Sequence, residues 1–194
     1  MISSGYRGRQ LPEQTAATLS RFHVKGREES FMRSKLKSRV RVFTLGYQGA
    51  DLNAYIETLQ QAGVGVVVDV RERAWSYNRR YIKSVMESAL ADAGIRYVHL
   101  RECGNPSINR RTATSVAECL DRYRDHIIAN PNALTALNEQ IHEASEIGCP
   151  ACLTCFEENP EDCHRSILLE LLLATNRWLE IRHLTTKRVG RGPA

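Results

Sequence analysis

The chain has 194 residues, of which 42% are hydrophobic and 25% are charged. These values lie near the globular average and exclude wholesale disorder, and no apolar run reaches the roughly 18 residues that a membrane-spanning helix needs. The N-terminus lacks the apolar core of a secretory signal. Six cysteines without such a signal lead us to expect a cytoplasmic protein in a reducing compartment, with no membrane partner.

The formal net charge of +5 is distributed unevenly. Residues 1–41 contain 10 Lys and Arg against 3 Asp and Glu, whereas the rest of the chain contains 17 against 19. Basic segments can recruit an acidic partner such as nucleic acid. We expect a largely flexible basic extension over residues 1–39, a single α/β domain over 40–185 and a basic tail over 186–194.

Strand-like and helix-like segments alternate along this domain. Continuous apolar or β-rich runs predict strands at 40–46, 64–70, 95–100, 151–155 and 179–184. Apolar residues at helical spacing predict helices at 50–62, 81–93, 115–128, 132–147 and 163–175. The polar stretch 101–114 is expected to be a loop.

This alternation predicts a three-layer α/β fold, in which helices flank a mainly parallel five-stranded sheet. The loops that follow parallel strands gather at one edge of the sheet, where open α/β folds bind ligands. The unusual residues of the chain fall in these loops.

The densest group of reactive side chains lies between the fourth strand and the last helix. Cys155 ends the strand, and Glu157, Cys163 and His164 follow it. Carboxyl and imidazole groups transfer protons, and a thiol can act as a nucleophile. We predict that these four residues are catalytic; the alternative is an ordinary helix start with thiols packed in the core.

The start of the last helix adds two features. Asp162 is expected to be its N-cap, and the free N–H groups there would attract an anion and favour the thiolate of Cys163. Arg165 in the first turn could bind a phosphate or carboxylate through two parallel hydrogen bonds.

Four motifs occur in a fixed order along the chain. They are Thr44-Leu45-Gly46-Tyr47, Asp69-Val70-Arg71, the third-strand segment 93–100, and Cys155-x-Glu157-x-x-Pro160-x-x-Cys163-His164-Arg165. Together they resemble the bacterial and archaeal family catalogued as "domain of unknown function 488", in which His replaces Tyr47. The resemblance covers about residues 42–184. It implies the α/β fold and the location of the site, and it supplies no reaction.

Asp69 and Arg71 form a second candidate group at the end of the second strand. An acid in this position can orient a base, hold a cation or accept from a ribose hydroxyl. We predict that Asp69 is catalytic and that Arg71 binds an anion, with Gly46 and Tyr47 completing the substrate site. The alternative is that Asp69 caps the loop while Arg71 pairs with Glu72 or a neighbouring acid.

Basic and aromatic residues alternate in the loop at 71–81. The predicted binding residues there are Trp75, Tyr77, Arg79 and Arg80. Because arginine contacts phosphate and aromatic rings stack on bases, this composition favours a nucleotide or single-stranded nucleic acid. It is also typical of protein interfaces. The loop after the third strand, with Arg110, would add positive charge nearby.

The cysteines at 149, 152 and 155 are spaced three residues apart. With Cys163, the trio Cys149, Cys152 and Cys155 forms a minor candidate for a zinc or iron–sulfur site. Residues three apart in a strand face opposite sides, however, which separates Cys152 from Cys155. We therefore predict no cofactor.

The function expected from these features is hydrolysis or group transfer on a phosphate-bearing, nucleotide-like or nucleic-acid substrate. Redox chemistry is disfavoured, since the chain has no Gly-x-Gly-x-x-Gly dinucleotide fingerprint. Two alternatives remain open. One is a nucleic-acid-binding module that uses the basic ends, and the other is a ligand-binding signalling or scaffold domain.

Overall fold

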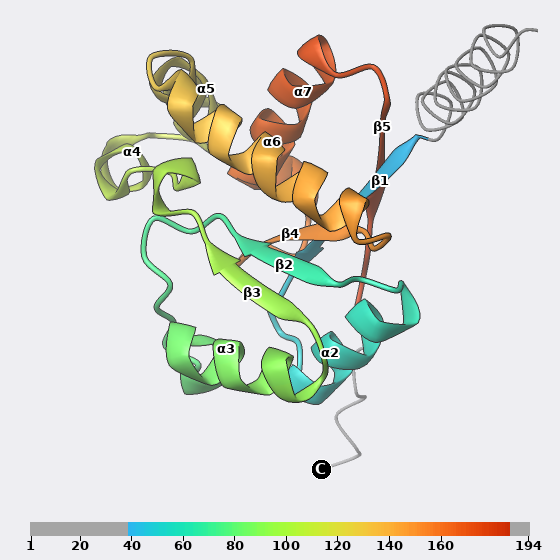
Figure 1. Ribbon diagram of the computed structural model, residues 1–194. Coiled ribbons are helices and arrows are strands. Elements are labelled where there is room, and N and C mark those ends of the chain that lie inside the picture. The colour runs from blue at the N-terminus through green and yellow to red at the C-terminus, as the bar shows by residue number, and fades with distance from the viewer. Residues whose placement is uncertain (1–38, 187–194) are drawn as a thin grey trace, which may run out of the picture. The chain divides into compact units, whose positions relative to one another are not determined.

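The computed structural model describes residues 39–186 (Figure 1). The predicted basic extension and basic tail therefore lie outside the described residues, apart from Arg39 and Thr186. The predicted α/β fold is confirmed. Five strands form one sheet, all of them parallel, and helices flank it. In the described part of the chain, no helix is long and apolar enough to cross a bilayer.

The elements alternate along the chain, as the sequence predicts. The strands are β1 (Val40–Gly46), β2 (Val66–Asp69), β3 (Arg96–His99), β4 (Ala151–Cys155) and β5 (Leu179–His183). The helices are α2 (Leu52–Gln61), α3 (Lys83–Asp92), α4 (Ser107–Thr112), α5 (Val116–Ile128), α6 (Pro131–Glu146) and α7 (His164–Thr175). Three short 3₁₀ turns are η1 (Arg79–Tyr81), η2 (Arg101–Cys103) and η3 (Pro160–Asp162).

The prediction of a loop at 101–114 was wrong, because this stretch contains the turn η2 and the helix α4. Helix α4 is only six residues long, and none of them is buried. It therefore leaves no apolar period in the sequence by which a helix could be recognised.

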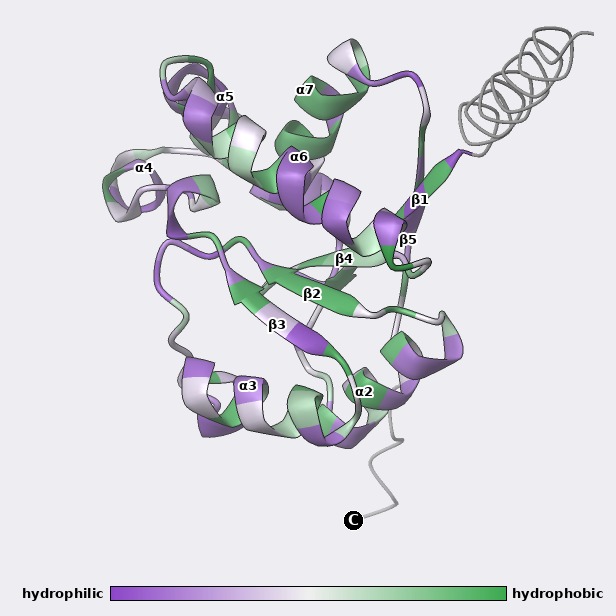
Figure 2. Ribbon diagram, in the orientation of Figure 1, coloured by the Kyte–Doolittle hydropathy of each residue, from purple (hydrophilic) through white to green (hydrophobic). Residues whose placement is uncertain are grey.

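The central strands are apolar because helices cover both of their faces. Every residue of β2 and β4 is buried, and Figure 2 shows β2 largely in the hydrophobic colour. Successive side chains alternate between two cores. Val66 and Val68 pack with α5, α6 and α7, whereas Val67 packs with α2 and α3. The same alternation places Cys155 in the first core and Cys152 in the second, as predicted.

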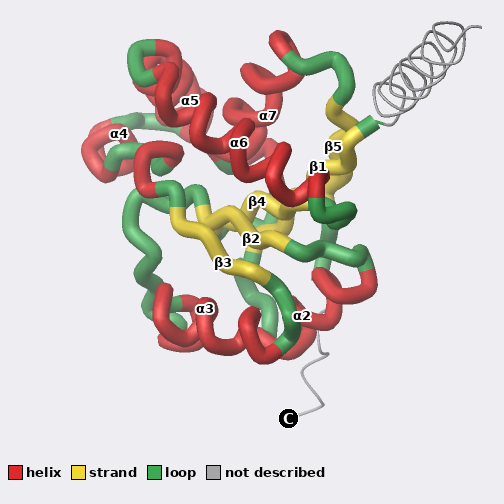
Figure 3. Tube along the Cα trace, viewed as in Figure 1, coloured by secondary structure: helices red, strands yellow, loops and turns green. Residues whose placement is uncertain are grey.

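The three layers are visible in Figure 3, where helices lie on both sides of the strands. A hydrogen-bonded chain ties the α2 layer to the sheet. The Tyr55 hydroxyl donates to Thr154 Oγ1 at 2.8 Å, and Thr154 donates to the Leu45 carbonyl at 3.0 Å. All three residues are buried, so this chain satisfies polar groups that would otherwise destabilise the core.

The strand order β3-β2-β4-β1-β5 places a topological switch point at the end of β4. Strands β1 and β2 lead into α2 and α3 on one face, whereas β4 leads into α7 on the other (Figure 1). Neighbouring strands whose connections leave to opposite faces are separated by a crevice at their carboxyl ends. Because β4 lies between β1 and β2, the residues that follow all three strands meet there.

Gly46 lets the end of β1 approach the loop after β4. The ladder continues past the strands, since Tyr47 N donates to the Cys155 carbonyl at 3.2 Å and Gln48 N to the Phe156 carbonyl at 2.8 Å. A Cβ atom on Gly46 would lie 1.8 Å from the Glu157 carbonyl oxygen. Only glycine fits this approach, because the obstructing atoms belong to the backbone.

We expect Gly46→Ala to lower the free energy of unfolding by about 1–3 kcal/mol, because the new methyl group overpacks against backbone. Urea denaturation measures the effect. Ser88→Ala, at an exposed position of α3, is the comparison and should not lower the free energy of unfolding. A Gly46→Ala protein as stable as wild type would contradict the prediction.

Candidate functional site

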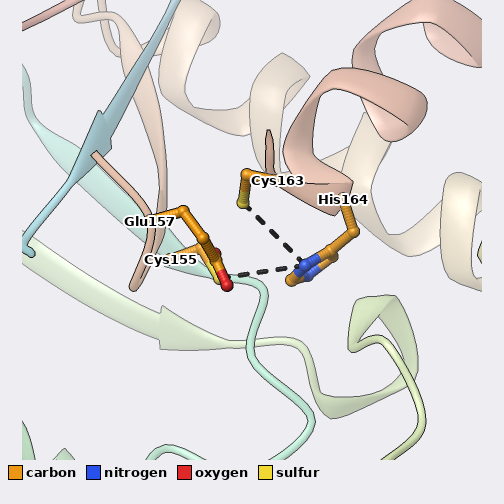
Figure 4. A group of neighbouring side chains, drawn as sticks. All are labelled: Cys155, Glu157, Cys163 and His164. Atoms are coloured by element: carbon orange, nitrogen blue, oxygen red, sulfur yellow. Dashed lines mark hydrogen bonds between the residues drawn. The ribbon is translucent and has the colours of Figure 1, made fainter. Parts of the chain in front are cut away.

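Four side chains predicted to be catalytic lie together at the end of β4 (Figure 4). They are Cys155, Glu157, Cys163 and His164, named here the Cys-Glu-His group, and their Sγ, carboxylate and ring nitrogen atoms all lie within 4.8 Å of one another. Cys155 Sγ is 3.1 Å from Glu157 Oε2 and 3.8 Å from His164 Nδ1, and Cys163 Sγ is 3.9 Å from the same nitrogen. Among the described residues, this is the group that could hold a metal ion.

The helix after the group begins later than the sequence suggests. Cys163, and not Asp162, is the N-cap of α7, and Asp162 ends the 3₁₀ turn η3. Pro160 starts that turn, and its cap Asn159 donates to the Asp162 carboxylate at 2.9 Å. The Cys163 side chain makes no capping hydrogen bond, so its sulfur can face His164.

The His164 imidazole is held in one orientation. Its Nε2 lies 2.7 Å from the Val70 carbonyl oxygen, which can only accept, so Nε2 carries a hydrogen and donates it. Nδ1 therefore faces the two sulfur atoms. The ring also packs edge-on against Tyr123, at 4.9 Å between centroids. Burial lowers the pKa of His164, but Cys163 and the Val70 carbonyl outweigh it and the net shift is upward.

Arg165 is a buried cation whose nearest anionic partner is a sulfur. The residue is 1% exposed, and its Nε donates to Cys163 Sγ at 3.2 Å. Nη2 donates to the Glu157 carbonyl at 2.6 Å, while Nη1 has no hydrogen-bond partner among the described residues. Two of the three guanidinium nitrogens therefore bond to protein atoms of the site. The sequence analysis had predicted that Arg165 binds a phosphate or carboxylate of the substrate.

The acidic groups of the site differ in their affinity for protons. Burial raises the pKa of Cys163, but hydrogen bonds from Cys155 and His164 and the charge of Arg165 bring it well below the usual thiol value. The hydrogen bond to Cys163 and burial raise the pKa of Cys155. Burial, followed by the charge of Cys163, raises the pKa of Glu157. Cys163 is therefore the preferred thiolate, and its charge disfavours further negative charge beside it.

Asp69 and Arg71 form a buried ion pair on the α2 and α3 side of the sheet. Arg71 Nη2 and Nε lie 2.5 Å and 2.8 Å from the two Asp69 oxygens, and Tyr97 donates to the same carboxylate at 2.6 Å. Arg71 Nη1 donates to the Tyr47 hydroxyl at 2.7 Å and to the Tyr81 carbonyl at 2.9 Å. Arg71 thus pairs with a neighbouring acid, Asp69, and not with Glu72. Asp69 Oδ1 also accepts from Arg71 N at 3.1 Å, as the capping alternative expects.

The other predicted residues of the first loop are also covered. Tyr47 is buried, stacks on Tyr81 with centroids 4.2 Å apart and meets the edge of Phe156. Gly46 faces the backbone of Glu157. Tyr47 and the Asp69–Arg71 pair are therefore buried on the α2 and α3 side of the sheet and do not line the pocket.

A pocket of about 430 Å³ opens beside the Cys-Glu-His group. Glu157, Asp162 and His164 line it from the segment after β4, and Asn105, Arg110 and the α5 N-cap Ser115 line it from the segment after β3. The sulfur-bearing Cys155 and Cys163 do not line it, and so lie behind Glu157 and His164. The loop segment that contains Asn105 and Arg110 was expected nearby, whereas Ser115 was not singled out, because the start of α5 was not connected with the site.

The aromatic residues of the 71–81 loop lie on the surface. Trp75 and Tyr77 are 58% and 94% exposed and contact each other edge-on at 4.7 Å. Arg79 is exposed, and Arg80 pairs with Asp51 at 2.5 Å. None of these side chains lines the pocket.

The four cysteines of the minor metal-site candidate, Cys149, Cys152, Cys155 and Cys163, do not lie together. Cys152 lies in the opposite core from Cys155, and the half-buried Cys149 faces the Ala144 carbonyl at 3.5 Å. The Cys-Glu-His group retains only Cys155 and Cys163 from that set. Strand alternation is the physical reason for the difference.

The comparison with protein families gives one match. The family model described as "Domain of unknown function DUF488" matches residues 51–172, more than half of the chain. No curated protein and no solved structure matches the chain significantly. The matched segment includes Asp69, Arg71 and the whole Cys-Glu-His group.

We expect Asp69→Asn to lower the free energy of unfolding by about 3–5 kcal/mol, because it leaves the Arg71 charge buried without its carboxylate. Urea denaturation measures the loss. The control is Glu170→Gln, which breaks an exposed two-bond pair with Arg124 and should cost at most about 1 kcal/mol. Similar losses in the two variants would show that the buried pair has no special role.

Proposed function

The chain belongs to the family of domains of unknown function DUF488, and since that description assigns no reaction, we propose from the site that it is an enzyme. The proposed reaction is hydrolysis or group transfer on a phosphate-bearing, nucleotide-like substrate. The observation that carries the proposal is a pocket that Glu157 and His164 line together with the basic Arg110 and the polar Asn105 and Ser115. Six free thiols support a cytoplasmic site of action.

Glu157 is the residue of the Cys-Glu-His group best placed to meet a substrate. It lines the pocket and is partly exposed, whereas the two thiols lie behind it. His164 also lines the pocket, but both of its ring nitrogens face groups of the protein. A carboxyl group at a pocket wall can exchange a proton with a bound molecule. We therefore assign proton transfer to Glu157 and a supporting role to His164.

The 105–115 segment of the pocket lining brings groups that suit an anionic ligand, beside the acids Glu157 and Asp162. Arg110 brings a half-exposed guanidinium, which its ion pair with Glu72 at 3.2 Å holds in place. Asn105 brings a buried amide, and Ser115 marks the positive end of the 13-residue helix α5. The Asn105 amide already donates to Cys119 Sγ at 3.3 Å and accepts from Asn109 at 3.2 Å, so the guanidinium of Arg110 is the group of this segment that suits a phosphate. The pocket volume is in the range that accommodates small molecules.

Glu157→Gln should lower turnover about a hundredfold or more, since the amide cannot transfer the proton. Nucleotides and phosphorylated metabolites are first screened by thermal shift, and each stabilising compound is then tested for conversion by mass spectrometry. Glu161→Gln, on the exposed turn η3, is the matched control and should retain the wild-type rate. Full activity in Glu157→Gln would overturn the role of Glu157. A compound that stabilises the protein without being converted would favour the ligand-binding alternative.

The second candidate function is binding of single-stranded nucleic acid. The observation that favours it is the exposed edge-on pair of Trp75 and Tyr77, with Arg79 beside it in the sequence. Such rings offer stacking surfaces for bases, and arginine contacts phosphate. The basic ends that were expected to strengthen this binding, residues 1–41 and 182–194, lie outside the described residues except for 39–41 and 182–186.

If this candidate is right, Trp75→Ala with Tyr77→Ala should weaken binding of a single-stranded oligonucleotide at least tenfold, because a stacked base contributes about 1–3 kcal/mol. Fluorescence anisotropy at several salt concentrations measures the affinity and its salt dependence. Ile128→Ala, which removes an exposed apolar side chain from α5, should leave binding unchanged. Equal affinity of the aromatic variant and wild type would exclude this surface.

A further inference from the structure

We propose that the Cys-Glu-His group binds a Zn²⁺ ion, with Glu157 as the ligand on the pocket side. The binding site itself stands on the geometry of the four side chains. A catalytic role for the ion rests on the proposed function, because the ion would be bound by Glu157, the residue to which proton transfer is assigned.

The spacing of the donor atoms fits a tetrahedral ion. Zinc bonds of about 2.0–2.3 Å put the corners of a tetrahedron about 3.3–3.8 Å apart. The His164 nitrogen lies 3.8 Å and 3.9 Å from the two sulfurs, and Cys155 Sγ lies 3.1 Å from Glu157 Oε2. The remaining pairs lie within 4.8 Å, so some donors must move inward to reach a common ion. The group is thus close to the dimensions of a zinc site, and small side-chain shifts complete it.

The donors are also oriented for an ion. Because the Val70 carbonyl holds the Nε2 hydrogen of His164, the lone pair of a neutral ring is on Nδ1, toward the sulfurs. A backbone carbonyl that fixes the remote ring nitrogen is the usual outer support of a metal-binding histidine. Arg165 Nε gives a similar support to Cys163 Sγ.

The charges of the site favour a divalent cation. Two thiolates and one carboxylate would carry three negative charges in a mostly buried space. The buried cation Arg165 contacts one of them, the Cys163 sulfur, and it can compensate only one of these charges. A single Zn²⁺ ion would neutralise the remainder, which removes the repulsion among groups otherwise forced to share protons.

The chemistry of the donors selects zinc over other metals. Two sulfurs and an imidazole are too soft a set for Mg²⁺ or Ca²⁺, which take oxygen ligands. An iron–sulfur cluster usually needs four thiolates, and Cys152, the cysteine nearest in sequence, lies in the opposite core. Two thiolates, an imidazole and a carboxylate are within the range of zinc sites.

The position of Glu157 points to a reactive ion. Glu157 and His164 line the pocket, so an ion among the four side chains would be reached from the pocket through its carboxylate ligand. Catalytic zinc ions keep three protein ligands and one position for water or substrate. A zinc ion there polarises a phosphoryl oxygen and acidifies bound water. Displaced from the ion, Glu157 remains placed to accept the proton.

Zinc content of the full-length, untagged protein tests the proposal. After expression in zinc-supplemented medium, mass spectrometry of the metal should find close to one equivalent. Cobalt is the probe of geometry, because Co²⁺ in its place should show the sulfur-to-metal absorption and the intense visible bands of a tetrahedral thiolate site.

Serine variants identify the ligands. Cys155→Ser and Cys163→Ser should each weaken zinc binding more than about a hundredfold, beyond the loss expected for an outer-sphere partner. Cys149→Ser is the matched control: it removes a half-buried thiol that belongs only to the sequence-based candidate, and it should bind zinc like wild type. Circular dichroism checks folding, and if a serine variant fails to fold, the cobalt spectrum of the wild-type protein decides.

Zinc below about 0.2 equivalents together with no cobalt–thiolate absorption would overturn the proposal. Wild-type zinc affinity in folded Cys155→Ser and Cys163→Ser would also overturn it. One equivalent of zinc with the expected cobalt spectrum supports the site whether or not a substrate is found. Failure of the substrate screen then counts against the proposed function alone.

Discussion

The position of β4 between β1 and β2 is the constraint on which the site depends. The connections after β1 and β2 run to one face of the sheet, and the connection after β4 runs to the other. The segments that follow these three strands therefore meet at the carboxyl end of β4. The absence of a side chain on Gly46 then brings the β1 end against the Glu157 backbone. The reactive groups are therefore positioned by the topology of the sheet before any of their own contacts form.

Two buried guanidinium groups support this crevice in different ways. Arg71 has a carboxylate partner, and its donors are directed at protein atoms. Arg165 has a sulfur and a carbonyl as partners and one nitrogen without any among the described residues. A cation with its own carboxylate stabilises structure locally, whereas one paired with a potentially ionised thiol lowers the cost of negative charge in the site. The Asp69–Arg71 pair therefore stabilises the structure beside the site. Arg165 favours negative charge on the Cys163 sulfur.

The sequence was informative where periodicity and burial agree. The continuous apolar run around β2 and the apolar spacing in α5 and α6 predicted those elements, and the reactive residues after β4 were predicted to act together. Helix α4 could not be predicted, because no residue in it is buried. The roles assigned to Asp69 and Arg71 came from their place at a strand end, and the sequence could not show that they pair with each other. That information depends on Tyr47, Tyr81 and Tyr97, which arrive from other elements.

The contact between His164 and Val70 has an evolutionary consequence. The acceptor that fixes the imidazole is a main-chain carbonyl, so no substitution of the Val70 side chain deletes it. Most substitutions of Val70 therefore leave the hydrogen bond that fixes the His164 tautomer in place. Side chains around the group can diverge in size and polarity while the lone pair of Nδ1 keeps its direction. The same carbonyl lies at the end of β2, so a displacement of that strand would turn the imidazole, and the histidine is mechanically coupled to the centre of the sheet.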